Sequence, residues 1–167
     1  MFRRKSNGEN GTETPNLLGT LLLVVDGSEP SIVAANFAVH LASQIGSTIT
    51  AVYVVDTATM DYLLQMHIFV SDERQEFERD VENTGKRYLE YVRTIGNNNG
   101  IEITTKLLNG SFHQTILAMA RNQKVDAIIL GGWRRSITRK DATSVERQLI
   151  LDEAECPVIV IKGEVHG

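Results

Sequence analysis

Three short apolar runs in the chain each end in residues that suit a binding site. These residues are Asp26-Gly27-Ser28, Val55-Asp56 and Gly131-Gly132. A carboxylate can bind a polar ligand group, and glycines let backbone N–H groups approach a phosphate without interference from a Cβ atom. In an open parallel sheet, ligands bind beyond the carboxyl ends of the strands, where the strand order reverses. The three sets are therefore candidate binding residues if the runs before them are neighbouring strands.

The other reactive side chains form no pattern that predicts catalysis or metal binding. The histidines, which we interpret as structural or exposed, are His40, His67, His113 and His166. They lack the spacing to each other, or to a nucleophile, that a metal site or a catalytic pair would need. The single cysteine, Cys156, cannot form an internal disulfide and is expected to pack in the core. We therefore predict a protein that is not an enzyme, with no catalytic residues and no bound metal.

Apolar periodicity predicts the elements that would position the candidate residues. The predicted strands are residues 21–25, 48–55, 101–108, 127–130 and 158–161. Helical spacing of apolar residues lies between them, with Ser28 as a cap of the first helix and Gly46 at its end. Asp72, with Gln75 three residues later, predicts the start of a long helix, while residues 56–70 fit either a loop or a short helix. This alternation predicts an α/β fold with a parallel sheet and helices on both faces.

Composition limits the kinds of partner that the chain can have. The 167 residues suit one domain, and the net charge of -4 gives no support for binding to nucleic acid or to an anionic membrane. The apolar runs are too short to span a bilayer, and the basic N-terminus lacks the apolar segment of a secretory signal. A cytoplasmic location is therefore expected. Residues 1–17 are polar and aperiodic, which predicts a disordered tail before a domain of residues 18–167.

Five fragments, in order, resemble the universal stress protein family. They are Val24-Val25-Asp26-Gly27-Ser28-Glu29-Pro30-Ser31, Val52-Tyr53-Val54-Val55-Asp56, Asn109-Gly110-Ser111, Asp126-Ala127-Ile128-Ile129-Leu130-Gly131 and Cys156-Pro157-Val158-Ile159-Val160-Ile161. The similarity covers about residues 18–163. It implies a flavodoxin-like open parallel sheet of five strands in the order 3-2-1-4-5. It also implies a homodimer that pairs through the last strand.

The resemblance further implies an adenine-nucleotide site, in a degraded form. One branch of the family binds ATP through Gly-x2-Gly-x9-Gly-Ser/Thr after the fourth strand. Gly131 matches the first glycine, Arg134 stands at the second, and the third falls on Thr143 or Ser144. The site residues that the resemblance implies are Asp26, Gly27, Val54, Leu130, Gly131, Arg134, Ser144 and Val145. Asp26 has an equally plausible role as a turn residue that satisfies backbone N–H groups.

Residues near this altered motif favour opposite outcomes for phosphate binding. Arg134 lacks the backbone freedom of glycine, and its side chain would fill or border the same space. Thr143 and Glu146 have the spacing of a capping box, which would bring a carboxylate to the helix start where phosphate would lie. Arg135, Arg139 and Lys140, with Arg134, could instead hold an anion through their side chains, although charged loops are more often solvated surface.

The sequence therefore favours a dimeric regulatory or stress-response module that acts through an unknown protein partner without strong ATP binding. The alternative is a sensor that binds ATP or another adenine nucleotide, and the least favoured function is a slow ATPase. The glycine-poor segment after the fourth strand separates the first hypothesis from the other two.

Overall fold

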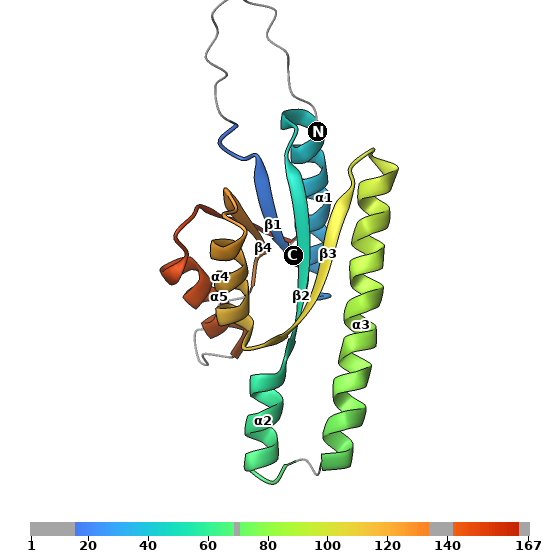
Figure 1. The fold of residues 1–167 in the computed structure, drawn as a ribbon, viewed down its shortest axis with the longest axis vertical. Coiled ribbons are helices and arrows are strands. Elements are labelled where there is room, and N and C mark those ends of the chain that lie inside the picture. Colours follow the sequence, from blue (N-terminus) through green and yellow to red (C-terminus); the bar gives the residue numbers. More distant parts are fainter. Residues whose placement is uncertain (1–15, 69–70, 134–141, 164–167) are drawn as a thin grey trace, which may run out of the picture.

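The computed structural model describes residues 16–68, 71–133 and 142–163. They form an α/β fold in which a central sheet lies between two layers of helices (Figure 1). Its five strands are β1 (Thr20–Val24), β2 (Thr48–Asp56), β3 (Ile103–Gly110), β4 (Ala127–Gly131) and β5 (Val158–Ile161). All pairings are parallel, and the strand order is β3-β2-β1-β4-β5. This order confirms the predicted flavodoxin-like fold. The order reverses between β1 and β4, which places a crevice at their carboxyl ends.

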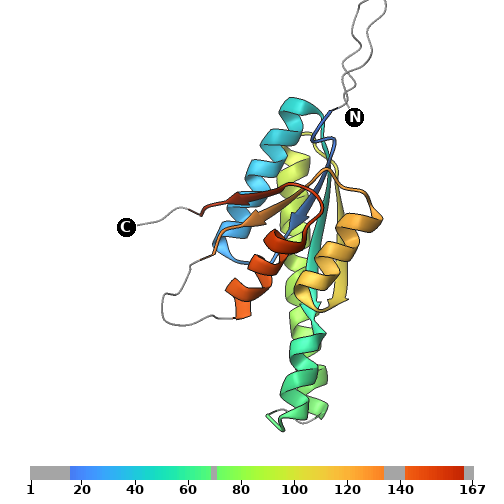
Figure 2. The same cartoon turned by 90° about the vertical axis from the view of Figure 1, so that its left-hand side faces the viewer.

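Of the five helices in the described residues, four cover the two faces of the sheet and one, α2, extends beyond it. The five helices are α1 (Glu29–Ile45), α2 (Thr57–Gln65), α3 (Ser71–Asn98), α4 (Phe112–Asn122) and α5 (Ala142–Glu153). Helices α1 and α3 lie on one face, and α4 and α5 lie on the other (Figures 1 and 2). Successive strand residues alternate between the faces, so Leu21 and Leu23 pack towards α1 and α3, while Leu22 and Val24 pack towards α4 and α5. The central strand β1 is therefore apolar at almost every position.

The first helix begins and ends where its sequence predicts. The Ser28 hydroxyl accepts a hydrogen bond from the Ser31 N–H at 3.3 Å, and Pro30 stands in the first turn. Gly46 follows the last turn with a left-handed φ of 76°, and its N–H donates to the Ala42 carbonyl. The long helix α3 begins at Ser71, one residue before the predicted start at Asp72.

Residues 56–70, for which the sequence allowed either a loop or a short helix, contain helix α2. The Asp56 carboxylate caps this helix by accepting the Thr59 N–H at 3.0 Å, and Met60 anchors its first turn in the core with 3% of its surface exposed. Helix α2 and the first turns of α3 extend beyond the carboxyl ends of the strands (Figures 1 and 2). Within the described residues, no helix is long and apolar enough to cross a membrane.

Candidate functional site

Asp26 lies just after β1, at the carboxyl edge of the sheet, and both of its carboxylate oxygens are bonded to protein groups. The Oδ1 atom accepts the Ser28 N–H at 2.9 Å and the Ser28 hydroxyl at 2.5 Å. The Oδ2 atom pairs with the guanidinium of Arg147, which comes from α5. Asp26 therefore acts as the turn residue that the sequence allowed and also joins the first turn of the fold to its last helix.

Arg147 lies at the switch point of the sheet, over the ring of Phe112. Its side chain is only 9% exposed, and its guanidinium carbon stands 4.6 Å from the centre of the Phe112 ring. Phe112 packs in the cluster on the α4–α5 side of the sheet, which also contains Val54 and Leu130. Four elements, β1, β2, β4 and α4, thus meet beneath one arginine from α5. A cation over a ring face is stabilised electrostatically, and more so where water is excluded.

Ser28 and Arg147 together keep Asp26 ionised. Burial raises the pKa of the Asp26 carboxyl, but hydrogen bonds from Ser28 and the positive charge of Arg147 outweigh burial, so the pKa lies below 3.8. Asp26 is therefore ionised at neutral pH. Burial, with the nearby charges of Asp26 and Tyr88, raises the pKa of Tyr53 on the neighbouring strand, so Tyr53 stays a neutral phenol.

The two candidate glycines are required by packing. Gly27 has a φ of 80°, and a Cβ there would lie 2.6 Å from the ring of Tyr88 on α3. A Cβ on Gly131 would lie 2.6 Å from the backbone nitrogen of Ser31, where the start of α1 crosses the end of β4. The absence of a side chain at Gly131 is thus explained by the fold itself, without a ligand.

The remaining predicted site residues are only partly brought to the crevice. Val54 and Leu130 are buried in its floor, as their place in the strands requires. Ser144 is half-buried in the first turn of α5, and its neighbour Val145 is 40% exposed. Arg134 and the other basic residues of segment 134–140 lie outside the described residues.

Glu146, which the sequence expects in a capping box with Thr143, turns its carboxylate oxygen Oε2 to α4, and the side chain of Thr143 lies outside the described residues. The Glu146 Oε2 atom accepts the backbone N–H of His113 at 2.9 Å and lies 2.5 Å from His113 Nδ1. Glu146 therefore caps the first turn of a neighbouring helix, where an anion is favoured by the exposed N–H groups. The Ser111 hydroxyl also lies near Nδ1, at 3.4 Å. These contacts join the first turns of α4 and α5, and we call the pair of Glu146 and His113 the helix clamp.

Arg147 is the site residue that sequence reasoning missed. It follows Ser144 by three positions, so both lie on the same side of α5. That spacing was visible, but the partner Asp26 lies 121 residues away in the chain. Only the fold shows that α5 returns to the turn after β1.

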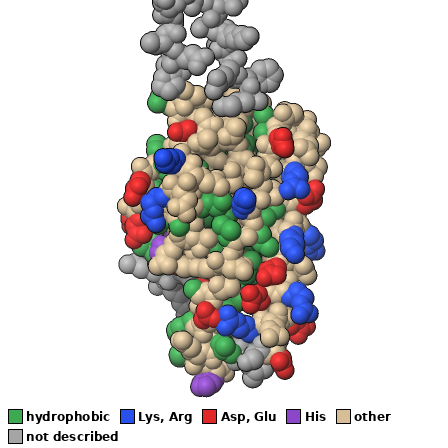
Figure 3. All heavy atoms as spheres, viewed as in Figure 1, with side chains coloured by type: hydrophobic (Ala, Val, Ile, Leu, Met, Phe, Trp, Pro, Cys, Tyr) green, Lys and Arg blue, Asp and Glu red, His purple; other side chains and the backbone are tan. Residues whose placement is uncertain are grey.

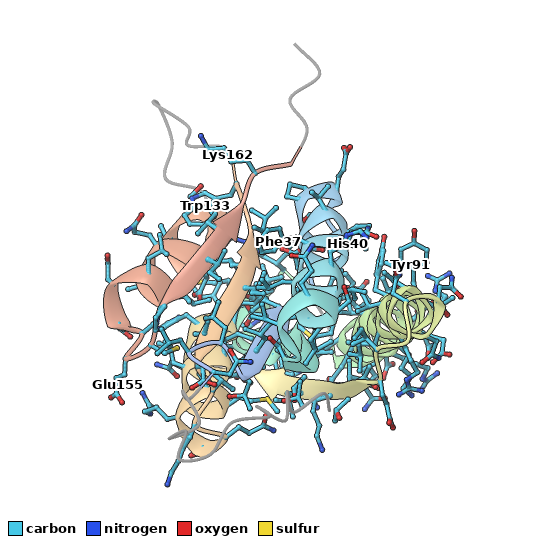
Figure 4. All side chains as sticks on the ribbon, turned by 90° about the horizontal axis from the view of Figure 1, so that it is seen from above. Phe37, His40, Tyr91, Trp133, Glu155 and Lys162 are labelled. Carbon is cyan, nitrogen blue, oxygen red and sulfur yellow. The ribbon has the colours of Figure 1, made fainter. Side chains whose placement is uncertain are left out.

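A separate groove of about 610 Å³ lies between α1 and α3, on the other side of the turn after β1. Gly27, Glu29 and Ile32 line one wall, and α3 supplies the other with Thr84, Arg87, Tyr88 and Tyr91. Figure 4 shows Tyr91 on α3 and His40 on α1 along this side of the molecule. Among the described residues, no group of three or more His, Cys, Asp or Glu could hold a metal ion.

The 3-2-1-4-5 parallel sheet, with an aspartate and a glycine at its switch point, has the arrangement expected of a flavodoxin-like binding protein. Comparison with known families gives the family to which the chain belongs. The model of the universal stress protein family matches residues 18–162, so the chain belongs to that family. A universal stress protein of Methanocaldococcus jannaschii is 24% identical over 156 residues, covering 93% of this chain and 85% of the relative. One of Bacillus subtilis is 22% identical, covering 87% of this chain and all of the relative.

Solved structures share the fold. A universal stress protein from Burkholderia pseudomallei superposes with a TM-score of 0.66 at 20% identity, covering 89% of this chain and 98% of the other. The protein from Archaeoglobus fulgidus in complex with dAMP has a TM-score of 0.58 at 19% identity, covering 87% and 98%. A further family member was solved in complex with cAMP, with a TM-score of 0.61 at 12% identity, covering 87% and 97%.

Proposed function

We propose that this chain is a dimeric regulatory module of the stress response, which acts through protein partners and does not bind ATP strongly. The observation that carries the proposal is the position of Arg147, which pairs with Asp26 and covers Phe112 in the switch-point crevice. The module is not an enzyme in this proposal, and its cytoplasmic location stays a prediction.

A nucleotide would have to displace Arg147 before it could reach Asp26 or the apolar floor. Breaking a largely buried ion pair leaves charged groups without their partner, which typically costs several kcal/mol. The cost is subtracted from the binding free energy, because only the fraction of molecules with Arg147 displaced is competent to bind. ATP binding is therefore weak in this proposal.

Calorimetry with ATP tests this directly. We expect a Kd above about 10 μM for the natural chain, a binding free energy weaker than roughly -7 kcal/mol. Arg147→Met keeps an apolar chain over Phe112 but frees Asp26, and we expect it to bind ATP more tightly. Arg121→Met, which removes an exposed arginine in the last turn of α4, is the control and should behave like the natural chain. A Kd below about 10 μM for the natural chain would overturn the proposal.

The second candidate function is a sensor of an adenine nucleotide smaller than ATP. It is favoured by the relatives that were solved with cAMP and with dAMP. Such ligands need fewer phosphate contacts, so the altered glycine motif matters less for them. Titration of the natural chain with cAMP and dAMP separates the two functions, since tight binding of either ligand, with weak ATP binding, supports the sensor. A slow ATPase is the least favoured function, and it would require ATP turnover by the purified chain.

The proposed dimer forms through β5, which ends the sheet. Among the described strands β5 pairs with β4 alone, and all four of its residues, Val158–Ile161, are apolar and half-exposed. An apolar edge strand invites pairing with another chain. Light scattering at micromolar concentration should therefore give the mass of two chains.

Ile159→Asp should shift that mass towards one chain. Because Ile159 also packs against the core, circular dichroism must show that the variant is folded. Thr104→Asp, at an exposed position of the opposite edge strand β3, is the matched control. A monomeric natural chain, or a folded Ile159→Asp variant that stays dimeric, would reject β5 as the contact.

A further inference from the structure

The hairpin formed by α2 and the start of α3 carries apolar side chains into solvent. We call residues 57–68 and 71–80 the helical arm. It extends beyond the carboxyl ends of the strands, away from the sheet (Figures 1 and 2). Tyr62, Met66 and Ile68 on the arm are 58%, 56% and 59% exposed. Tyr62 on α2 and Met66, the cap residue at its end, are four residues apart and so lie on the same face. Together with the nearby exposed Ile68, we call them the apolar strip.

The arm has a defined shape although it lies outside the core. Met60 fixes the base of α2 in the core. Further along, Arg74 on α3 pairs with Asp61 on α2 at 2.5 Å and approaches Glu78 at 3.9 Å. Interactions of this kind hold two helices side by side without burying the strip on α2. The strip is therefore available on a preformed surface, and little conformational entropy would be lost when another molecule covers it.

The arm is also strongly acidic. It contains six Asp or Glu residues and two Arg residues, and its excess of four negative charges equals the net charge of the whole chain, -4. The acidic residues are Asp61, Asp72, Glu73, Glu76, Glu78 and Asp80. Figure 3 shows charged side chains along the α3 side and apolar side chains over α2 at the same end of the molecule. An apolar strip bordered by negative charge is complementary to a cationic amphipathic partner.

We propose that the helical arm is the docking surface for a protein partner that presents a basic amphipathic helix. The apolar face of that helix packs on Tyr62, Met66 and Ile68, and its Lys and Arg residues lie against the acidic start of α3. A second copy of the chain is a poor occupant, because two arms would bring like charges together. An anionic membrane is repelled for the same reason. The inference rests on the proposed function, since it assigns the surface through which the module meets its partner.

A synthetic peptide provides the probe. We would label a peptide of about 18 residues, Leu on one helical face and Lys on the other, and measure its fluorescence anisotropy with the full chain at physiological salt. A second peptide with Glu in place of every Lys has the same apolar face. We expect the Lys peptide to bind at least about tenfold more tightly than the Glu peptide. Equal affinities would overturn the proposal.

Variants locate the binding to the arm. Tyr62→Ser with Met66→Ser should weaken Lys-peptide binding by about tenfold. Phe37→Ser with Ile45→Ser removes two exposed apolar residues of α1, which are 40% and 39% exposed, and should leave binding unchanged. Equal binding by the natural chain and the arm variant overturns the proposal. So does a fall in oligomer mass in the arm variant, which indicates a second copy, or binding to anionic vesicles. None of these readouts depends on ATP, so the arm can fail while the weak ATP binding of the proposed function stands.

Discussion

Asp26 has two candidate roles at the switch point, as a contact for a nucleotide and as a residue that stabilises the turn after β1. In this chain its two carboxylate oxygens are engaged by Ser28 and Arg147, which belong to the first turn and the last helix of the fold. An aspartate whose oxygens are engaged in this way is stabilising in its ionised form. The same interactions that make Asp26 useful to the fold make it less available to a ligand.

A pH-dependent contribution to stability follows from the lowered pKa of Asp26. Because its pKa in the folded chain lies below 3.8, ionised Asp26 stabilises the fold above that pH, and the contribution is lost as the pH falls through the folded value. We expect Asp26→Asn to lower the free energy of unfolding by about 1–3 kcal/mol at neutral pH. The difference from the natural chain should shrink at about pH 3.

Urea unfolding at the two pH values measures this. Asp152→Asn is the control, because Asp152 is exposed and accepts a hydrogen bond only from Gln148 among the contacts described. A difference between Asp26→Asn and the natural chain that is the same at both pH values would show that the Asp26 charge does not stabilise the fold.

Gly131 illustrates how a residue that matches a binding motif can serve packing. A Cβ there would meet backbone atoms of Pro30 and Ser31 at 2.6–2.7 Å, and backbone cannot move aside as a flexible side chain can. We expect Gly131→Ala to lower the free energy of unfolding by about 1–3 kcal/mol. Gly132→Ala, whose Cβ would lie 3.3 Å from the Ile161 carbonyl, should cost less. Thermal unfolding of both variants measures these losses of stability. Equal losses for Gly131→Ala and Gly132→Ala would contradict the packing role of Gly131.

At the scale of elements, α4 and α5 are joined by a clamp that crosses between their first turns. Glu146 Oε2 accepts the backbone N–H of His113 and also lies 2.5 Å from its ring nitrogen Nδ1. We expect Glu146→Ala to destabilise the fold by about 1–2 kcal/mol, as loss of a helix cap does. His113→Ala should cost less, because its backbone N–H still reaches Glu146.

Chemical unfolding measures both variants of the clamp, with Glu153→Ala, at an exposed position near the end of α5, as the control. A larger loss for His113→Ala than for Glu146→Ala would show that the ring contact, and not the cap, stabilises the pair.

The sequence predicted the capping of α1 but did not predict the clamp between α4 and α5. The five strands, the Ser28 cap and the Gly46 stop depend on short-range patterns, and all were predicted from them. Thr143 and Glu146 also have a short-range pattern, a capping box, but it gives no sign of the donor on α4 that binds Glu146 Oε2. Asp26 and Arg147 have no local signal, since their pairing depends on how α5 crosses the sheet edge.

Helix α2 was predicted only in part, as one of two possible structures for residues 56–70. Asp56 and Thr59 have the spacing of a capped helix start, and the structure uses it. The apolar residues after them lacked a clear period, because most of α2 lies on the arm and buries few side chains, of which Met60 is the example. An element that does not face a core leaves little periodic pattern in its sequence.

At the scale of the whole molecule, the two edges of the sheet differ in what they offer to a partner chain. Edge strand β3 exposes Thr104 and Lys106, and charged residues on an edge discourage pairing with another strand. Edge strand β5 has four apolar residues without a charge. The proposed dimer contact at β5 and the proposed docking arm, which extends beyond the carboxyl ends of the strands, use separate elements of the fold (Figure 2). Both surfaces can therefore be occupied together.

The N-terminal boundary of the domain can be tested to within two residues. The sequence predicts that residues 1–17 are a dispensable tail, and the structure describes the last two of them. Asn16 Nδ2 donates to the Ile45 carbonyl at the end of α1 at 2.8 Å, and Asn16 Oδ1 accepts the Leu18 N–H at 3.1 Å. These bonds satisfy a carbonyl that the last turn of a helix leaves unpaired, and each contributes about 1 kcal/mol or less at an exposed position.

We therefore expect deletion of residues 1–15 to leave the melting temperature unchanged, whereas deletion of residues 1–17 lowers it by about 2–4 °C, the shift that roughly 1 kcal/mol produces in a domain of this size. Asn16→Ala in the full chain should reproduce most of the second effect, because it removes the side-chain bonds and keeps the backbone. Differential scanning calorimetry of the three proteins at one pH measures the shifts. A fall of more than about 5 °C on deleting residues 1–15 would place part of the fold before Asn16, and equal melting temperatures for both deletions would show that the bonds of Asn16 add nothing to the end of α1.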